Sequence, residues 1–392
     1  MNRSLATAGA AFLMLLTAST SGAQQIVIGA SLPLSGALAS FGAFQRWGYE
    51  KAVAEANAAG GLVVGSKRIR VRLVIRDDQT NAVTSAANVE TLISRDRATA
   101  LLGSCTPALV NAGALVAERH HLPMVTGCDP KHAFTSVRPW RSIWDIFFDE
   151  QDLANAPFEA LASVEASTNR RVAILHDNGP DGEVVGGRYW PVLARKYGWT
   201  VVVSATFPVD NTQFMSILAQ AKARNADLVL VDATTPQAIS IRQQMAAIGY
   251  RPKALVMEKG AEPAQFANAL GRLADGVLVG GYWDALAGYP GAKDLMLAYQ
   301  RETGKPASQH IADSYTAAKV LLQAISAAGS LVPAAINTAI GRTDGEFVVG
   351  RVHFDAQHFA RLPIVSMQWQ QGATVVVWPA KFATGKLLFP LR

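Results

Sequence analysis

Short apolar runs alternate with longer segments of helical amphipathic period along most of the chain. The first series of runs covers residues 25–31, 69–75, 98–103 and 122–126, separated by amphipathic segments at 43–58, 81–95 and 108–120. A second series has runs at 171–176, 199–206, 227–232 and 254–258, separated by segments at 184–197, 212–224 and 236–248. Continuous apolar runs are typical of buried parallel strands, which need helical crossovers. The pattern therefore predicts an α/β protein with two doubly wound lobes.

Residues 138–157 lie between the two series and have a different texture. This segment, RPWRSIWDIFFDEQDLANAP, is rich in aromatic and acidic residues, and we expect it to cross between the lobes. Helices predicted at 292–303 and 309–328 return to the first lobe, and GRVHFD, LPIVSMQW and ATVVVWP are expected to complete the second lobe as short strands. The expected division is an N-terminal lobe of residues 24–146 plus 283–349 and a C-terminal lobe of residues 147–282 plus 350–392, joined by three crossings.

The loops that follow the strands are where binding residues are expected. Ligands of open parallel sheets bind beyond the carboxyl ends of the strands, and two joined lobes leave a cleft there. These loops are SLPLSGALASFG, DDQTN, GSCTP, TGCDP, HDNGPDGE, DATTP and MEKGAE.

The first 23 residues have the order of a secretory signal peptide. Arg3 precedes the apolar stretch LATAGAAFLMLLTA, and small residues end the segment at Ala23. A retained membrane anchor is the alternative, but the stretch is shorter than the roughly 20 residues that a span needs. We expect a soluble mature chain that begins near Gln24 and, in a bacterium, a periplasmic location.

Composition adds two restrictions. The chain has 392 residues, of which 50% are apolar and 17% charged, so it is expected to fold rather than to be disordered. Its net charge of +6 comes from singly scattered basic residues, which excludes the basic run of a nucleic-acid-binding arm. Cys105 and Cys128 each follow an apolar run of the first series, and an exported protein favours a disulfide between them; two separate thiols are the alternative.

The motifs GxSxG, GxxxxGK[ST] and HExxH, which mark common catalytic and phosphate-binding sites, do not occur in the sequence. Residues 177–188 lack two ligands of a calcium loop, because Gly179 stands where Asp or Asn is expected and Arg188 where a bidentate Glu is needed. The carboxylates of Asp77 and Asp78 are interpreted as a cap for the helix at 81–95. We therefore expect no enzymatic activity, no metal and no cofactor.

Several segments, in their order along the chain, resemble the periplasmic binding proteins of the Leu/Ile/Val-binding type, which are the solute receptors of amino-acid and amide ABC importers. The matching segments are IVIGASLPLSGALASFG, GYEKAVAEANAAGGL, RDDQT, VETLISRDRATALLG, AERHHLPMVTG, LADGV, DSYTAAKVLLQAISAAGS and GRVHFD. The resemblance implies the type I periplasmic binding protein fold, whose two lobes close around a small ligand and then dock on a membrane permease.

The resemblance also implies a ligand site. Phe41 takes the place of an aromatic residue that covers the side chain of aliphatic ligands. Hydroxyl and backbone groups of two loops take the ligand carboxylate in the family, and both loops open helices whose N-terminal N–H groups favour an anion. The equivalents here are Ser104, Cys105, Thr106, Thr126, Gly127 and Cys128. A ligand that carries a carboxylate is therefore expected.

The second lobe departs from the family's pattern. In the family, two tyrosines of this lobe contact the ligand. In this chain Thr234 or Thr235 takes the place of one, and the other is missing from the loop near Asp181. In the family, an acidic residue holds the ammonium group of the ligand. Lys259 stands at that position in this chain, and Glu258 is adjacent to it. Lys259 in the cleft would suit a ligand without an ammonium group, whereas Glu258 would suit an amino acid, and a slip of one residue at a strand end reverses which of them faces the cleft.

Two further positions stay open at this stage. Asp129 or Pro130 stands where amino-acid binders present a hydroxyl group. Trp47 and Trp283 are candidates for stacking walls that would suit an aromatic acid, and a core or hinge role is the alternative for each.

The first hypothesis for function is a monomeric, non-enzymatic receptor of an ABC importer. Its ligand would be a branched-chain amino acid, an amide or an aromatic acid. The alternative is a sensory receptor that presents the same kind of solute to a signalling partner.

Overall fold

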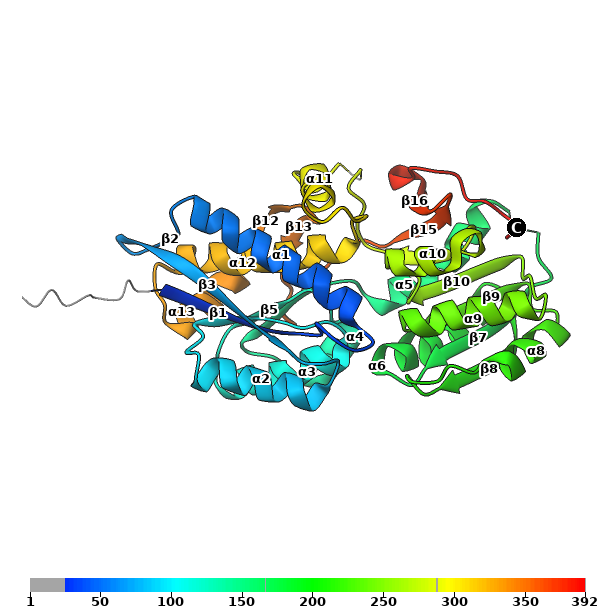
Figure 1. The fold of residues 1–392 in the computed structure, drawn as a ribbon, viewed down its shortest axis with the longest axis horizontal. Coiled ribbons are helices and arrows are strands. Elements are labelled where there is room, and N and C mark those ends of the chain that lie inside the picture. Colours follow the sequence, from blue (N-terminus) through cyan, green and yellow to red (C-terminus); the bar gives the residue numbers. More distant parts are fainter. Residues whose placement is uncertain (1–24, 166, 287, 392) are drawn as a thin grey trace, which may run out of the picture.

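The computed structural model describes residues 25–165, 167–286 and 288–391, and the predicted signal peptide lies outside them. Two lobes lie side by side along the long axis of the molecule, each built around one seven-stranded sheet (Figure 1). Helices cover both faces of each sheet, which confirms the predicted fold class of two doubly wound α/β lobes.

The N-terminal sheet has the strand order β14-β6-β5-β4-β1-β3-β2, and its strands are parallel except β2, which is antiparallel to β3. Its strands are β1 (Gln25–Leu32), β2 (Leu62–Val64), β3 (Lys67–Asp77), β4 (Ala100–Leu102), β5 (Met124–Thr126), β6 (Ile143–Phe147) and β14 (Phe359–Arg361). Because β4, β5 and β6 are parallel neighbours, the loops that follow them lie together at one edge of the sheet.

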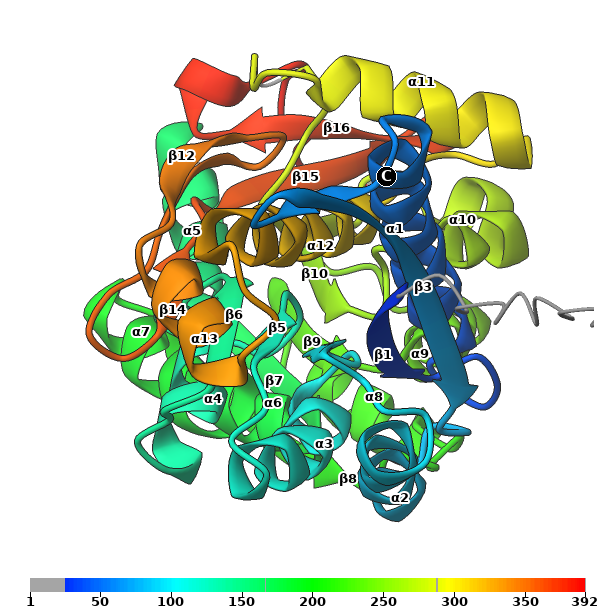
Figure 2. The ribbon, with the colours of Figure 1, turned by 90° about the vertical axis from the view of Figure 1, so that its left-hand side faces the viewer.

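Helices α1 and α12 pack on each other over one face of this sheet, and α2 and α3 cover the other face (Figures 1 and 2). Gly48 allows the close packing of α1 and α12, because a Cβ atom there would lie 2.8 Å from the backbone nitrogen of Tyr315. The helices of this lobe are α1 (Ala39–Ala58), α2 (Ala82–Ser94), α3 (Pro107–Arg119), α4 (Lys131–Val137), α11 (Ala292–Thr303), α12 (Gln309–Ala328) and α13 (Pro333–Gly341).

The C-terminal sheet has the order β16-β15-β11-β10-β9-β7-β8, and β15 and β16 are antiparallel to their neighbours. Its strands are β7 (Arg171–Asp177), β8 (Thr200–Phe207), β9 (Leu228–Ala233), β10 (Ala254–Lys259), β11 (Leu278–Gly281), β15 (Val365–Gln370) and β16 (Ala373–Trp378). Alternate residues of β7 enter different cores: Val172 and Ile174 join the core shared with the N-terminal lobe, whereas Ala173 and Leu175 join one under α8 and α9.

The segment predicted as one helix over 184–197 is in fact composite. A π-helical stretch, Glu183–Tyr189, lies between the short turn α6 and helix α7. Such stretches are frequent at functional sites, and Val185 of this one lines the cavity described below. The helices of this lobe are α5 (Glu150–Ser163), α6 (Pro180–Gly182), α7 (Trp190–Lys196), α8 (Met215–Ala223), α9 (Thr235–Ala247) and α10 (Ala264–Leu270), with 3-10 turns at Gly271–Leu273 and Ala380–Phe382.

The chain crosses between the sheets after β6, after β11 and after β14. The expectation that residues from 350 onward belong to the C-terminal lobe is wrong for the first part of this segment. Strand β14 pairs in parallel with β6, with Phe359 opposite Asp145, and β13 (Gly350–His353) forms a hairpin with β12 (Asp344–Phe347). The third crossing therefore falls between Arg361 and Val365.

The expected cap of the helix at 81–95 is also corrected. Asn81, not Asp77 or Asp78, caps α2, because its side chain accepts a hydrogen bond from the backbone of Thr84 at 3.0 Å. Asp77 instead accepts the backbone N–H groups of the loop after β1, including that of Leu34 at 3.0 Å.

In the part of the chain that the structure describes, no single helix is long and apolar enough to cross a membrane, although α12 and α13 together meet the length and composition across a bend of 117°.

Candidate functional site

A cavity lies between the lobes, at the carboxyl ends of the strands of both sheets. The space between protein atoms there, including the solvent at its open mouth, amounts to about 600 Å³. Both lobes contribute to its wall, which is formed by Phe41, Cys105, Thr106, Pro107, Cys128, Pro130, Phe147, Phe148, Leu153, Asp181, Val185, Asp232, Glu258, Lys259, Glu262, Gly280, Gly281, Tyr282, Gln309 and His310.

A disulfide between Cys105 and Cys128 forms part of this wall, as the sequence predicted. It joins the loop after β4 to the loop after β5, with 4.9 Å between the Cα atoms. A ring nitrogen of His310 lies within 4.8 Å of both sulfur atoms, but neither sulfur is a thiolate while the bond is present. This group therefore has no thiolate ligand to offer a metal ion.

Aromatic side chains form the apolar half of the cavity. Phe147 ends β6 and Phe148 follows it, and the ring of Phe147 lies 4.8 Å from that of Tyr282, measured between centroids. Phe41, on α1, packs edge-on against His310 at 4.9 Å. Such a wall suits an apolar chain or ring on the ligand.

Lys259 does not offer a free positive charge to the cavity. Its ammonium group lies 2.9 Å from carboxylate oxygens of both Asp177 and Asp181 and 3.3 Å from Asp232. Burial lowers the pKa of Lys259, but these three carboxylates outweigh burial and raise the pKa well above 10.5. The lysine is therefore charged, and its charge is already neutralised by the protein.

Glu258 and Glu262 each keep one carboxylate oxygen without a hydrogen-bond partner. The other oxygen of Glu258 accepts from the backbone N–H of Gly280 at 2.7 Å, and that of Glu262 accepts from the hydroxyl of Ser308 at 2.7 Å. Burial raises the pKa of Glu258 to about 8, and the neighbouring charge of Asp232 adds to this. The pKa of Asp232 is raised to about 7, again mainly by burial.

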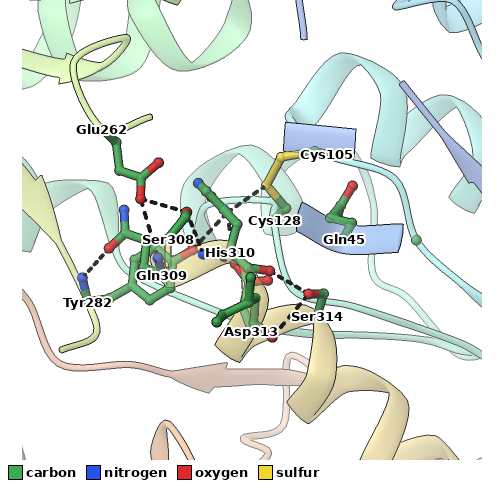
Figure 3. A network of polar contacts seen from close by, with 12 residues as sticks. Gln45, Cys105, Cys128, Glu262, Tyr282, Ser308, Gln309, His310, Asp313 and Ser314 are labelled. Atoms are coloured by element: carbon green, nitrogen blue, oxygen red, sulfur yellow. Dashed lines mark hydrogen bonds and ion pairs between the residues drawn. A yellow bond between two sulfur atoms is a disulfide. The ribbon is translucent and has the colours of Figure 1, made fainter. Parts of the chain in front are cut away.

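Figure 3 shows how the start of α12 holds this side of the cavity. The Nδ1 atom of His310 lies 2.9 Å from the carboxylate of Asp313, to which the hydroxyl of Tyr282 also donates. The side-chain oxygen of Gln309 accepts from the backbone of Tyr282 at 2.9 Å. These bonds fix His310 and Tyr282 in place on the wall.

The predicted site residues divide into two groups. Those that line the cavity are Phe41, Cys105, Thr106, Cys128, Asp181, Glu258 and Lys259. Ser104, Thr126, Gly127 and Thr234 do not line it. Ser104 donates to Asp78 at 2.8 Å, Thr126 is fully buried at the end of β5, and Gly127 packs against the backbone of Asp313.

The other open positions are placed as follows. Thr234 caps α9 together with Gln237. Pro130, not Asp129, reaches the cavity. Neither tryptophan lines the cavity: the indole of Trp47 donates to Glu302 at 2.9 Å, and that of Trp283 donates to the carbonyl of Val348 at 2.8 Å.

Groups of the protein occupy the start of α4 and part of the start of α3, the helix N-termini that were expected to hold a ligand carboxylate. The first helical N–H groups of α4, from His132 and Ala133, donate to the carboxylate of Glu150 at 2.7 and 2.8 Å. At the start of α3, the N–H of Thr106 donates to the carbonyl of Cys128 at 3.1 Å, and Pro107 has no N–H.

Sequence reasoning missed Phe147, Tyr282, Glu262 and His310. Phe147 is the last residue of the apolar run IWDIF, and Tyr282 follows the run VLVGG, so their position at a strand end was a usable signal. Glu262 and His310 reach the cavity from a loop and from the start of a helix, and no local pattern indicates that.

Comparison with known proteins agrees with this architecture. A family model described as periplasmic binding protein matches residues 25–374. The Leu/Ile/Val-binding protein homolog 8 of Brucella suis is 27% identical over 95% of each chain.

Solved structures show the same fold, the type I periplasmic binding protein fold. The branched-chain amino acid transporter substrate binding protein LivJ from Streptococcus pneumoniae, in complex with isoleucine, has a TM-score of 0.81 at 21% identity, covering 91% of this chain and 100% of that one. A solute binding protein from R. palustris in complex with benzoate has a TM-score of 0.78 at 17% identity, covering 90% and 96%.

Proposed function

Because the chain belongs to the family of periplasmic binding proteins, we propose that it is the solute receptor of an ABC importer and captures a small molecule between its two lobes. The cavity between the lobes carries this proposal. Phe41 and the disulfide face it from the N-terminal lobe, and Glu258 and Lys259 face it from the C-terminal lobe. A ligand held by both lobes favours their closure, because it contacts the second lobe only when the cleft is shut.

The receptor binds its solute without converting it, acts as a monomer, and delivers the solute to a membrane permease. Its binding free energy comes from burial of the ligand against the aromatic wall, while a few polar contacts set the orientation. Isoleucine and benzoate, the ligands of the two structural relatives above, each carry a carboxylate, as does the class of ligand expected from the sequence.

The test is a thermal-shift screen of the purified mature protein against amino acids, amides, organic acids and amines, since a ligand of the folded state raises the melting temperature. We expect at least one small solute to shift the transition. Mass spectrometry of the incubated solute should then return it unchanged. Turnover of the solute would contradict a receptor.

Location is tested on the protein made in a bacterial host with its full N-terminus. We expect the protein in the periplasmic fraction with a mature N-terminus near Gln24. A protein that stays in the cytoplasm with Met1 still in place would contradict the proposed location.

A further inference from the structure

The C-terminal lobe forms one side of the cavity with three acidic residues, Asp232, Glu258 and Glu262, which we call the acceptor wall. Asp232 and Glu258 are cross-strand neighbours on β9 and β10, and Glu262 follows β10 in the chain. One carboxylate oxygen of Glu258 and one of Glu262 have no hydrogen-bond partner, whereas the corresponding oxygen of Asp232 lies 3.3 Å from the ammonium of Lys259. The three residues Asp232, Glu258 and Glu262 are 2%, 1% and 8% exposed. Buried acceptors without donors are unfavourable, so a ligand that brings N–H groups to them gains binding free energy.

The same wall offers little to a ligand carboxylate. Among the described residues that line the cavity, two have basic side chains, Lys259 and His310. Lys259 is held by three aspartates, and His310 by Asp313. The fully buried side-chain atoms of the described lining residues that lack a hydrogen-bond partner are all carboxylate oxygens.

The N-terminal lobe does not supply the positive charge that a ligand carboxylate would need. Glu150 already occupies the start of α4, and Thr106 and Pro107 leave few donors at the start of α3. A ligand carboxylate would therefore enter a cavity whose lining carboxyl groups outnumber its basic side chains, which is unfavourable.

The other half of the cavity is apolar, with Phe41, Phe147, Phe148 and Leu153 among its lining residues. A ligand that fits both halves has a positive head rich in N–H groups and an apolar body.

We propose that the solute is a small organic cation: a protonated amine with an apolar chain or ring and without a carboxylate. Its ammonium group donates to the unpaired oxygens of Glu258 and Glu262, and its body lies against Phe41 and Phe147. Binding of the cation displaces the proton that the buried carboxyl of Glu258 holds in the free protein, because a nearby positive charge favours the ionised form. This assignment rests on the proposed receptor function and names its ligand class.

The test uses three ligands that share one side chain and differ in their charged groups. These are 3-methylbutylamine, leucine and 4-methylpentanoate, with 2-phenylethylamine, phenylalanine and 3-phenylpropanoate as an aromatic set. Binding to the mature protein is measured by calorimetry at pH 7. We expect the amine of at least one set to bind, and to bind roughly 100-fold more tightly than the amino acid and the acid of that set.

The variants Glu262→Gln and Glu258→Gln each replace a carboxyl group of the acceptor wall by an uncharged amide that cannot ionise, with little change of shape. Each should weaken amine binding about tenfold or more, and the second covers the case in which the first does not fold. Asp210→Asn, at an exposed turn, is the matched control and should bind the amine as the wild type does.

Tighter binding of leucine or of either acid than of the matching amine would overturn the ligand class and leave the receptor function standing. Amine binding that neither Gln variant weakens would also overturn it, because the acceptor wall would then not hold the head group. If none of the six ligands binds, the proposed ligand class is wrong. If, in addition, no solute of the wider thermal-shift screen raises the melting temperature, the proposed receptor function is wrong as well.

Discussion

At the scale of single residues, Glu258 links the stability of the protein to pH. Its pKa is raised from an ordinary 4.5 to about 8 because the carboxyl group is buried. Between these two values the folded protein keeps a proton that the unfolded chain has released. The contribution of this group is therefore fully present below about pH 4.5 and is lost as the pH rises through about 8.

We expect the free energy of unfolding to fall by a few kcal/mol between pH 5 and pH 9, since each pH unit between the unfolded and the folded pKa costs about 1.4 kcal/mol per such group. Glu150, whose pKa is raised to about 7 by burial, acts in the same direction. Urea unfolding at each pH measures the effect, and Glu258→Gln should flatten the curve. A wild-type stability that rises from pH 5 to pH 9 would contradict this account.

Lys259 provides the second prediction at this scale. Lys259→Ala would leave Asp177, Asp181 and Asp232 facing one another in a buried site without a counter-charge. Removal of one partner from a buried ion pair costs about 3–5 kcal/mol, and we expect a loss of that size in urea unfolding at pH 7.

Lys253→Ala is the control for this variant, because Lys253 pairs with Asp227 at the surface, at 3.1 Å. The control should lose no more than about 1 kcal/mol. Equal losses in the two variants would mean that the buried cluster does not depend on its lysine.

The pair Glu258 and Lys259 also shows what sequence could not predict. Consecutive residues of a strand face opposite sides, so the sequence posed a choice between them. Lys259 has a φ of 59°, in the left-handed region, and this turn at the end of β10 breaks the alternation. Both side chains therefore line the cavity, a result that depends on the backbone of one residue and not on a pattern.

At the scale of elements, the disulfide ties the loops after β4 and β5 across 23 positions of sequence. A closed loop of this size restricts the unfolded chain and stabilises the fold by roughly 3 kcal/mol. We expect the variant with both Cys105→Ser and Cys128→Ser to lose about that much in chemical unfolding.

Reductant supplies the control for this third prediction. Dithiothreitol should lower the stability of the wild type and leave the double serine variant unchanged. Equal stability of the wild type with and without reductant, under conditions where thiol titration shows the bond to be broken, would refute a stabilising role.

The elements show which parts of the fold the sequence encodes locally. Alternating apolar runs and amphipathic segments were sufficient to predict both sheets and most of their helices. The edge strand β14 was assigned to the wrong lobe because three residues carry little pattern and its partner, β6, lies more than 200 positions earlier. For the same reason a pocket side chain such as His310, on a returning helix, stayed hidden.

At the scale of the whole molecule, the two lobes touch across the cleft. The hydroxyl of Ser40, on α1, donates to the side chain of Gln265, on α10, at 2.8 Å. The guanidinium of Arg188 donates to Nε2 of His132, on α4, at 2.9 Å. Burial and the charge of Arg188 lower the pKa of His132, which keeps its ring neutral and able to accept this bond near pH 7.

These bonds exist only when the lobes are together, so the fourth prediction concerns closure. Hinge closure around a ligand makes the molecule more compact. Small-angle X-ray scattering of the mature protein should give a smaller radius of gyration with saturating ligand than without it. Equal radii in the two states would contradict a hinged trap.

The bonds between the lobes should act on ligand release and not on folding. The variant Ser40→Ala with Gln265→Ala loses an exposed hydrogen bond worth about 0.5–1.5 kcal/mol, which corresponds to roughly two- to tenfold faster dissociation in stopped-flow measurements. Thr338→Ala, which removes a hydroxyl of α13 remote from the cleft, should leave the rate unchanged. Faster release in the control but not in the double variant would mean that opening is not limited by contacts between the lobes.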